Sequence, residues 1–406
     1  MKFVKSMRGI FVIALLILWA GYAVLNMIDR AAYVRLGFNE GWDIESKLDG
    51  AAGAANAGVF LQGGLQNANA YIDDSLNRQT SNELTIVRGD NGQLSYSSYY
   101  PFETYSFEAQ ADSLRQIQAY MQEQGGSFLY LSGMDAYVEG SSSYGAFPVA
   151  NLNPRADAFL YYLNGFGVDY LDARAVLEDS ALPPSEYRYK TETKWTVQAS
   201  FEAYLAMVEE LKQQGSGIAP DAARGQFEQA SYPKSFVGHI GKRVGIPSVE
   251  YEDFTLITPA YQTDFTVESI TAEGTLHKTE QGDFSTVILD TEWMEKQNPY
   301  ERDMYSTYLT GEYPLRVIHN NLAADGEKVL FIGDSSMLPV ASFLAPSVGE
   351  LHLLWLYTVP NGYDNLIEYC EENGIDSVIV GMAPGSLGNV GFGFLDGIDS
   401  VASGAS

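Results

Sequence analysis

Hydrophobic and polar positions repeat along this chain in two ways. Between Phe107 and Gln124, apolar side chains recur every three or four residues, as at Leu114, Ile117 and Met121, which predicts an amphipathic helix. Short unbroken apolar runs instead indicate strands buried on both faces. From about residue 101 the two patterns alternate, with strands expected at SFLYLSG, VDYLDAR, KVLFIGDSS, ELHLLWLY and DSVIVGM, and helices at PRADAFLYYLNGFG, TVQASFEAYLAMVEELKQ and GYDNLIEYCEENG. The alternation predicts an α/β fold with a mainly parallel sheet and helices on both faces.

The longest apolar run indicates where the protein is located. Gly9–Ile28 follows the cations Lys2, Lys5 and Arg8, and its length matches the roughly 20 helical residues that span a bilayer. We expect an uncleaved transmembrane anchor, because secretory signals have shorter apolar regions. A signal cleaved at Ala23 is the alternative. Cations before the span keep residues 1–8 in the cytoplasm, so the rest of a single-pass membrane protein would be extracytoplasmic.

Composition gives approximate boundaries for the remainder. Residues 29–100 are rich in Gly, Ala, Asn and Ser and predict a stalk or linker with some weak helix. The regular pattern then predicts one α/β domain over residues 101–395 and a tail over 396–406. Residues 230–300 are less regular, which suggests an inserted lobe rich in β-strands.

Charge and metal-ligating residues exclude some functions. The formal net charge is −28, and no basic stripe opposes it, so nucleic acid is not an expected partner. The single cysteine, Cys370, cannot form an internal disulfide and lies in a helical pattern typical of a buried thiol. The four histidines are not at metal-ligand spacing, so neither a metal site nor a cofactor is expected.

One apolar strand ends at a possible nucleophile. The run KVLFI leads into Gly333-Asp334-Ser335 and then into a helical pattern. Chemistry in α/β sheets gathers at the carboxyl ends of strands, and backbone N–H groups at such a turn can hold an oxyanion. Asp334 or Ser335 could equally be a simple helix N-cap.

Five blocks in order resemble the DHHW-motif proteins, relatives of the alginate O-acetyltransferase enzymes of the SGNH-hydrolase superfamily. The blocks are YKTETKWTVQASFEAY, SFVGHIGKRVGI, TGEYPLRVIHNN, LFIGDSSMLPVASFLAP and ENGIDSVIV, which span roughly residues 100–380. The resemblance implies an SGNH-hydrolase-like domain outside the cytoplasm, often tethered to the membrane. It also implies a Ser-His-Asp triad that moves acetyl groups on envelope polysaccharide.

Transferred residue by residue, the resemblance implies an altered triad. The family serine corresponds to Ser335 and the aspartate to Glu192, but the triad histidine corresponds to Lys194. Trp195 keeps the family tryptophan; we expect it in the core beneath the site, although sugar stacking is possible. At pH 7 only about one free lysine side chain in a few thousand is neutral. A nearby Glu192 would favour the charged form of Lys194 further.

A second hallmark also differs. The family has Gly-Gly-Asn-x-Pro where this chain has TGEYP, so Gly311 is kept but Glu312 replaces the asparagine. A carboxylate there opposes the charge of an oxyanion, or it pairs with Lys194 across the site. Among the histidines, His239 in FVGHIGKR is the best candidate for a replacement base.

Three functions remain open on these residues, and the third, a purely structural envelope protein, would leave the Gly333-Asp334-Ser335 turn unused. The first is an O-acetyltransferase or acetylesterase of envelope polysaccharide with an impaired or altered triad. The second is a non-catalytic relative that binds polysaccharide or a partner, such as a membrane acyltransferase or an export complex.

Overall fold

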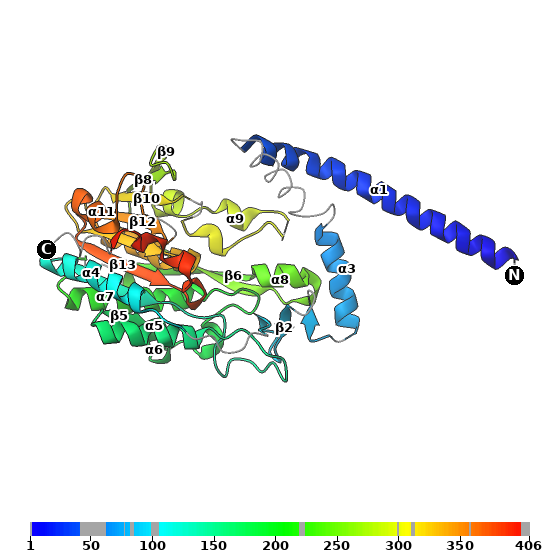
Figure 1. The fold of residues 1–406 in the computed structure, drawn as a ribbon, viewed down its shortest axis with the longest axis horizontal. Helices are drawn as coiled ribbons and strands as arrows, with labels where there is room; N and C mark the ends of the chain where they lie inside the picture. Colours follow the sequence, from blue (N-terminus) through cyan, green and yellow to red (C-terminus); the bar gives the residue numbers. More distant parts are fainter. Residues whose placement is uncertain are drawn as a thin grey trace. The chain divides into compact units, whose positions relative to one another are not determined.

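The computed structural model describes residues 2–40, 62–76, 78–81, 85–98, 105–218, 224–298, 300–309, 313–356 and 359–398. The chain divides into two compact units, Met1–Leu76 and Asn77–Ser406. Figure 1 labels many of their helices and strands.

Among the residues that the structure describes, the first unit includes the helices α1 (Lys2–Glu40) and α3 (Gln62–Ser75). Within α1, Gly9–Ile28 is long and apolar enough to cross a membrane, and none of it is buried against protein. The length and composition of this helix suit a membrane anchor or a signal. Part of the expected stalk, residues 41–61, lies outside the described residues.

The second unit is built on an eight-stranded sheet with the order β5-β4-β13-β11-β12-β10-β8-β9. Its strands are β4 (Ser127–Ser132), β5 (Tyr170–Asp172), β8 (Phe265–Ile270), β9 (Leu276–Gly282), β10 (Leu315–Asn320), β11 (Lys328–Gly333), β12 (Glu350–Trp355) and β13 (Ser377–Met382). The first five in spatial order are parallel, and β10, β8 and β9 continue the sheet with antiparallel pairing. These five parallel strands are the five that the apolar runs predicted, so the mainly parallel sheet is confirmed.

Helices cover both faces of this sheet. Successive strand residues point to opposite faces. In β11, Val329 and Phe331 therefore enter one core, while Leu330 and Ile332 enter the other. The first core also contains residues of α6 (Ala173–Glu178), α7 (Val197–Gln213) and α10 (Leu338–Leu344). The second contains residues of α4 (Glu108–Glu123), α5 (Asn153–Phe166) and α11 (Leu366–Asn373). The predicted three-layer arrangement is confirmed, and Cys370 is buried in α11 as expected.

Two smaller sheets lie outside the main one. One joins β1 (Thr80–Ser81), β2 (Ile86–Arg88) and β3 (Leu94–Tyr96), and the other pairs β6 (Phe227–Phe236) with β7 (Glu252–Pro259). The first sheet packs Ile86 and Leu94 on Ile240 and Val244 of α8 (His239–Val244). This sheet lies within the second unit, which begins at Asn77, whereas composition placed the start of the domain at residue 101. The expected lobe over 230–300 is also only partly separate, since β8 and β9 extend the main sheet.

The remaining helical turns are short. They are η1 (Pro184–Glu186), η2 (Arg224–Gln226), η3 (Ile246–Ser248), η4 (Phe284–Ile288), α9 (Glu292–Glu295), η5 (Tyr305–Thr307), η6 (Ser335–Met337), η7 (Ala345–Ser347), η8 (Pro384–Ser386) and η9 (Asn389–Leu395).

Candidate active site

Ser335 follows the carboxyl end of β11, between the parallel strands β12 and β13. Its side chain is exposed, although Asp334 and Ser336 on either side are buried. Gly333 permits the tight turn, because a Cβ there would lie 2.9 Å from the Phe331 ring and 3.1 Å from Cβ of Met337. The turn therefore presents one hydroxyl to solvent at the edge of the sheet. Among the described residues, that hydroxyl forms no hydrogen bond with an imidazole.

The Asp334 carboxylate braces this turn. It accepts hydrogen bonds from the Ser336 backbone N–H at 2.9 Å and from the Ser336 hydroxyl, so it is the N-cap of η6. Its second oxygen accepts from the Ala383 backbone N–H at 2.8 Å and from the Ser386 hydroxyl at 2.6 Å. The capping interpretation is confirmed for Asp334, and the extra bonds tie the serine turn to the end of β13.

The Ser336 carbonyl connects the turn to the segment that precedes α7. It accepts hydrogen bonds from the indole N–H of Trp195 at 2.7 Å and from the Tyr305 hydroxyl at 2.8 Å. Trp195 is only 1% exposed, so it lies in the core as expected and has no face free for a sugar. Thr196, the next residue, caps α7 by accepting from the Ala199 backbone N–H.

Lys194 precedes this tryptophan and is half-buried. Its Nζ lies 5.0 Å from the centroid of the Tyr305 ring, within range of a cation–π interaction. Tyr305 therefore contacts Lys194 through its ring and the serine turn through its hydroxyl. Gly311 and Glu312 lie outside the described residues, so the pairing of Glu312 with Lys194 stays a prediction.

Glu192 is 3% exposed, and its carboxylate bonds to His239 rather than to Lys194. Oε1 lies 2.5 Å from Nδ1 of His239, and Oε2 accepts from the His239 backbone N–H at 2.9 Å. Burial by itself raises the pKa of Glu192, but the hydrogen bond from His239 and the charge of Lys194 outweigh it and hold that pKa far below its usual value. The carboxylate is therefore charged at neutral pH and fixes the orientation of the imidazole.

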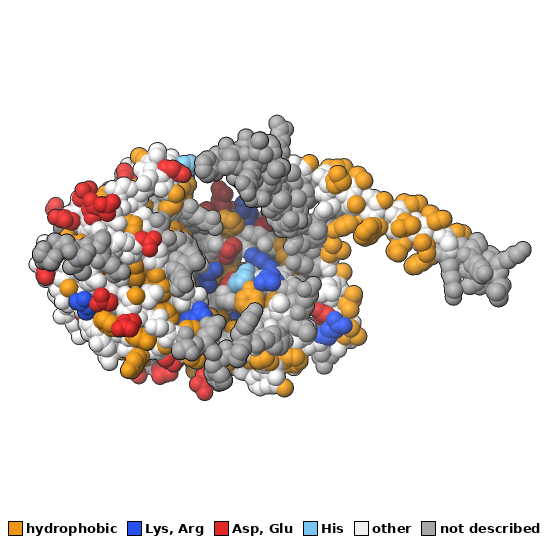
Figure 2. All heavy atoms as spheres, viewed as in Figure 1, with side chains coloured by type: hydrophobic (Ala, Val, Ile, Leu, Met, Phe, Trp, Pro, Cys, Tyr) orange, Lys and Arg blue, Asp and Glu red, His pale blue; other side chains and the backbone are white. Residues whose placement is uncertain are grey.

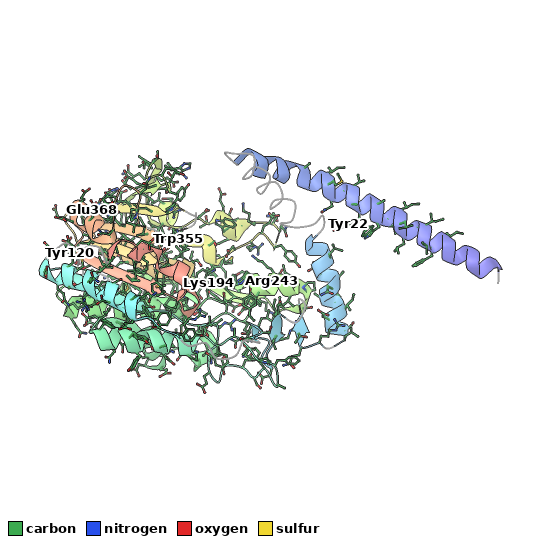
Figure 3. The ribbon with its side chains drawn as sticks, viewed as in Figure 1. Tyr22, Tyr120, Lys194, Arg243, Trp355 and Glu368 are labelled. Carbon is green, nitrogen blue, oxygen red and sulfur yellow. The ribbon has the colours of Figure 1, made fainter. Side chains whose placement is uncertain are left out.

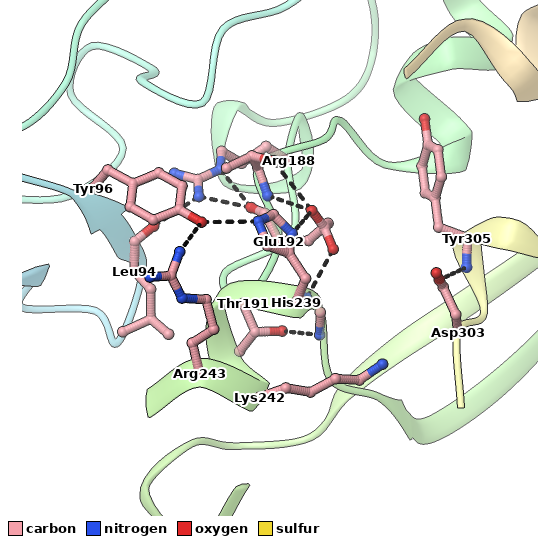
Figure 4. A network of polar contacts seen from close by, with 12 residues as sticks. Leu94, Tyr96, Arg188, Thr191, Glu192, His239, Lys242, Arg243, Asp303 and Tyr305 are labelled. Carbon is pink, nitrogen blue, oxygen red and sulfur yellow. Dashed lines mark hydrogen bonds and ion pairs between the residues drawn. The ribbon is translucent and has the colours of Figure 1, made fainter. Parts of the chain in front are cut away.

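The far side of the imidazole is also engaged, as Figure 4 shows. Nε2 of His239 lies 3.1 Å from the Tyr96 hydroxyl, which accepts a hydrogen bond from Arg243 at 3.1 Å. The Arg243 guanidinium also lies 5.5 Å from the Tyr96 ring centroid. Sequence reasoning selected His239 but missed Tyr96 and Arg243. Tyr96 falls in the stretch taken for a linker, and the alternating pattern of β3 is too short to identify a strand.

Comparison with known proteins identifies the fold. No family model and no curated protein matches this chain. Among solved structures, Bacillus cereus PatB1 aligns with a TM-score of 0.58 and 18% identity, covering 76% of this chain and 97% of that one. A DHHW family protein from Eubacterium siraeum aligns with a TM-score of 0.52 and 18% identity, covering 76% and 97%.

The chain shares the fold of these two proteins. This likeness agrees with the α/β architecture that the sequence predicted. At this level of identity the likeness extends to the fold alone, so the assignment of individual residues rests on their contacts.

Within this fold, the segment from Glu192 to Trp195 connects His239 to the turn that carries Ser335. One end holds His239 and the other holds the serine turn, with Lys194 between them. The space-filling view in Figure 2 shows a hollow in this face of the molecule where Lys/Arg, Asp/Glu and His side chains gather. No group of three or more His, Cys, Asp or Glu in the described residues is arranged to hold a metal ion.

The other histidines have separate roles. His319 Nδ1 and His352 Nε2 contact opposite oxygens of Glu350, at 2.9 and 2.7 Å. The hydrogen bond from His352 is the main cause that lowers the pKa of Glu350 to about 2, against the opposing effect of burial.

A cavity of about 580 Å³ lies away from the candidate site. Tyr120 is one of its lining residues, and Figure 3 places Tyr120 at the opposite end of the domain from Arg243.

Proposed function

We propose that this chain is a membrane-anchored, extracytoplasmic SGNH-hydrolase-like protein of cell-envelope polysaccharide O-acetylation or assembly. Ser335 is its acyl-accepting nucleophile, and its acid–base groups differ from a Ser-His-Asp triad. The observation that carries the proposal is the exposed hydroxyl of Ser335 on a turn braced by buried Asp334 and held by Trp195 and Tyr305. A hydroxyl fixed by buried neighbours is preorganised for attack on a bound acyl group.

The compared structures support a nucleophile on this fold. One PatB1 structure carries a sulfonyl adduct. Sulfonyl electrophiles react with activated nucleophilic side chains, so a protein with this fold can carry an activated nucleophile. The DHHW resemblance links the fold to acetyl groups on envelope polysaccharide, which makes that polymer the proposed partner.

Position 194 favours the second candidate function. Lys194 is where the resemblance implies the triad histidine, and its contact with the Tyr305 ring suits a charged ammonium rather than a neutral base. A site without a proton acceptor would bind polysaccharide, or a membrane acyltransferase or export partner, without turning it over.

A covalent probe and an acetyl ester separate the two candidates. The full-length protein in detergent is treated with a sulfonyl fluoride and analysed by mass spectrometry, and acetyl ester turnover is measured in parallel. We expect one adduct on Ser335, with adduct and turnover both lost in Ser335→Ala. Ser285→Ala, which removes an exposed serine of η4, is the matched control and should behave as wild type. Equal turnover in wild type and Ser335→Ala, with no adduct, would support the binding protein instead.

The proposed topology has its own test. We expect external protease to degrade the second unit in intact cells from which the outer layers have been removed, while a tag placed before Lys2 is protected. A soluble product lacking residues 1–23 would show that the apolar helix is a cleaved signal.

A further inference from the structure

A cavity of about 380 Å³ lies where the antiparallel strands extend the main sheet. Its apolar floor includes Leu315 and Val317 of β10, which face the second core. Residues 359–361 and the α11 residues Tyr369 and Asn373 contribute to its wall. Small-molecule sites in proteins occupy about 300–1,000 Å³, so this cavity has room for one compact ligand beside α11.

The register of the sheet directs four titratable side chains toward this cavity. Directly paired residues share a face of a sheet, as do alternate residues of one strand. Val317 of β10 pairs with His352 and, on its other side, with Glu268. His319, two residues later on the same strand, pairs with Glu350. The two carboxylates and two imidazoles therefore line the cavity together, next to its apolar floor.

The carboxylate of Glu350 fixes the tautomers of both imidazoles. It lies 2.9 Å from Nδ1 of His319 and 2.7 Å from Nε2 of His352. The bond from His352 is the main cause that lowers the pKa of Glu350 to about 2, so this carboxylate is charged at neutral pH and can only accept. Both nitrogens therefore carry protons, and Nδ1 of His352 accepts from the Tyr369 hydroxyl. When His319 is neutral, its lone pair is on Nε2.

Nε2 of His319 faces a second hydrogen-bond acceptor. It lies 4.0 Å from Oε2 of Glu268, and the two side chains are each 37% exposed. Within the part of the chain that the structure describes, no protein group donates a hydrogen bond to either atom. An ammonium nitrogen about 2.8 Å from each atom would make an angle of roughly 90° with them, which two N–H bonds of one ammonium can serve. The gap therefore suits a donor that carries at least two protons.

The charge around this gap favours a cation. With neutral imidazoles, the carboxylates of Glu268 and Glu350 outnumber the single cation Lys328, whose Nζ lies 3.4 Å from Glu350. The formal charge of −28 on the whole chain attracts cations further. A water molecule could fill the gap, but it would leave the charge of Glu268 uncompensated.

We propose that this cavity binds a primary amine on a compact, partly apolar body, with the ammonium group between Nε2 of His319 and Oε2 of Glu268. The body of the ligand packs on Leu315 and Val317. An amino sugar has this chemistry, either as a free monosaccharide or as the terminal unit of a polymer. Binding is non-covalent and does not involve Ser335, so the inference can fail or hold independently of the proposed acyl chemistry.

Isothermal titration calorimetry on the full-length protein in detergent, at about pH 7.5, tests the inference with cyclohexylamine as the probe. Its ring is a compact apolar body, and its amine is charged at this pH. Cyclohexanol, which has the same ring without the charge, is the matched control ligand. We expect cyclohexylamine to bind at least about 10-fold more tightly, because hydrogen bonds between charged groups are stronger than those between neutral ones.

Glu268→Gln removes the charge and keeps the size of the side chain. Glu268 is half-exposed, so this variant should fold, as circular dichroism would check. We expect its affinity for cyclohexylamine to fall at least about 10-fold, the usual effect of losing a charged partner. Glu228→Gln removes an exposed carboxylate of β6 and should bind as wild type does. Equal affinity in wild type and Glu268→Gln, equal affinity for the two ligands, or no binding by wild type would each overturn the inference.

A proton on Nε2 of His319 would compete with the ammonium group. Affinity for cyclohexylamine should therefore fall from about pH 7.5 to about pH 5.5, where imidazoles titrate. The charged and titratable groups around His319 are Glu268 and Glu350, with His352 and Lys328 on the far side of Glu350. Affinity that does not change over this interval would refute the role of the lone pair.

Glucosamine and its linked tetramer separate the two sources of the amine. Binding of both would indicate a unit of a polymer, and binding of the monomer alone would indicate a free amino sugar. Binding of cyclohexylamine without either sugar would overturn the amino sugar as the ligand.

Discussion

Substitution of Gly238 by alanine tests the contact on which the Glu192–His239 pair depends. The new Cβ would lie 2.4 Å from the Thr191 carbonyl oxygen and 2.5 Å from Cβ of Glu192, whereas ordinary contacts begin at 3.4 Å. The backbone must therefore separate by about 1 Å. Gly238 has φ −72° and ψ 175°, which alanine adopts freely, so the effect is steric and not conformational.

The neighbours of this Cβ cannot move independently. The backbone N–H and the hydroxyl of Thr191 both donate to Glu252, at 2.9 and 2.5 Å, and Arg188 holds the Glu192 carbonyl. Overpacking of a fixed site costs about 1–3 kcal/mol. The lower entropy of the unfolded alanine chain returns about 0.4–1 kcal/mol. We expect a net loss of about 1–2 kcal/mol in the free energy of unfolding, with weakened alignment of His239.

Gly165→Ala is the matched control. Gly165 lies within α5, and nothing lies within 4 Å of a Cβ placed there. Alanine in an exposed helix is favoured over glycine by about 1 kcal/mol, so this variant should be more stable than wild type. Urea unfolding followed by circular dichroism measures both variants. If Gly238→Ala gains stability as Gly165→Ala does, α8 does not approach residues 191–192 closely. The contact on which the Glu192–His239 pair depends would then be absent.

Three further predictions concern groups elsewhere in the domain. Trp195→Phe removes one of the two hydrogen-bond donors to the Ser336 carbonyl, so we expect it to destabilise the fold by about 1–2 kcal/mol and to slow sulfonylation of Ser335. Phe201→Leu, in the same core, should lower stability without slowing sulfonylation. Glu350 has a depressed pKa of about 2, so its contribution to the free energy of unfolding is fully present above the ordinary carboxyl pKa of 4.5 and is lost as the pH falls toward 2. The free energy of unfolding, measured by urea titration, should decline over this interval by an amount on the order of 1 kcal/mol after solvent screening, and Glu350→Gln should flatten the decline. Burial raises the pKa of the Cys370 thiol to about 12, so iodoacetamide at pH 8 should label the native protein slowly and the urea-unfolded protein rapidly; fast labelling of the native state would contradict the burial.

The sequence by itself determined most of the framework. Strand and helix patterns depend on neighbouring residues, so the five parallel strands and the helices α4, α5, α7 and α11 were predictable from local periodicity. The serine turn was recognisable for the same reason, because an apolar strand, a glycine and a capping aspartate are consecutive in the chain. The antiparallel extension by β10, β8 and β9 was not predicted, since their shorter alternating patterns also suit a separate lobe.

The partners of the site residues were decided by tertiary structure alone. Glu192 could have met Lys194 two residues away, but it bonds to His239, 47 residues along the chain. Tyr96 reaches the same imidazole across 143 residues from a stretch whose composition suggested a linker. Local patterns carry no information about such contacts. They arise only when α8 packs against β3 and residues 191–192, so that the buried polar groups find their partners within the protein.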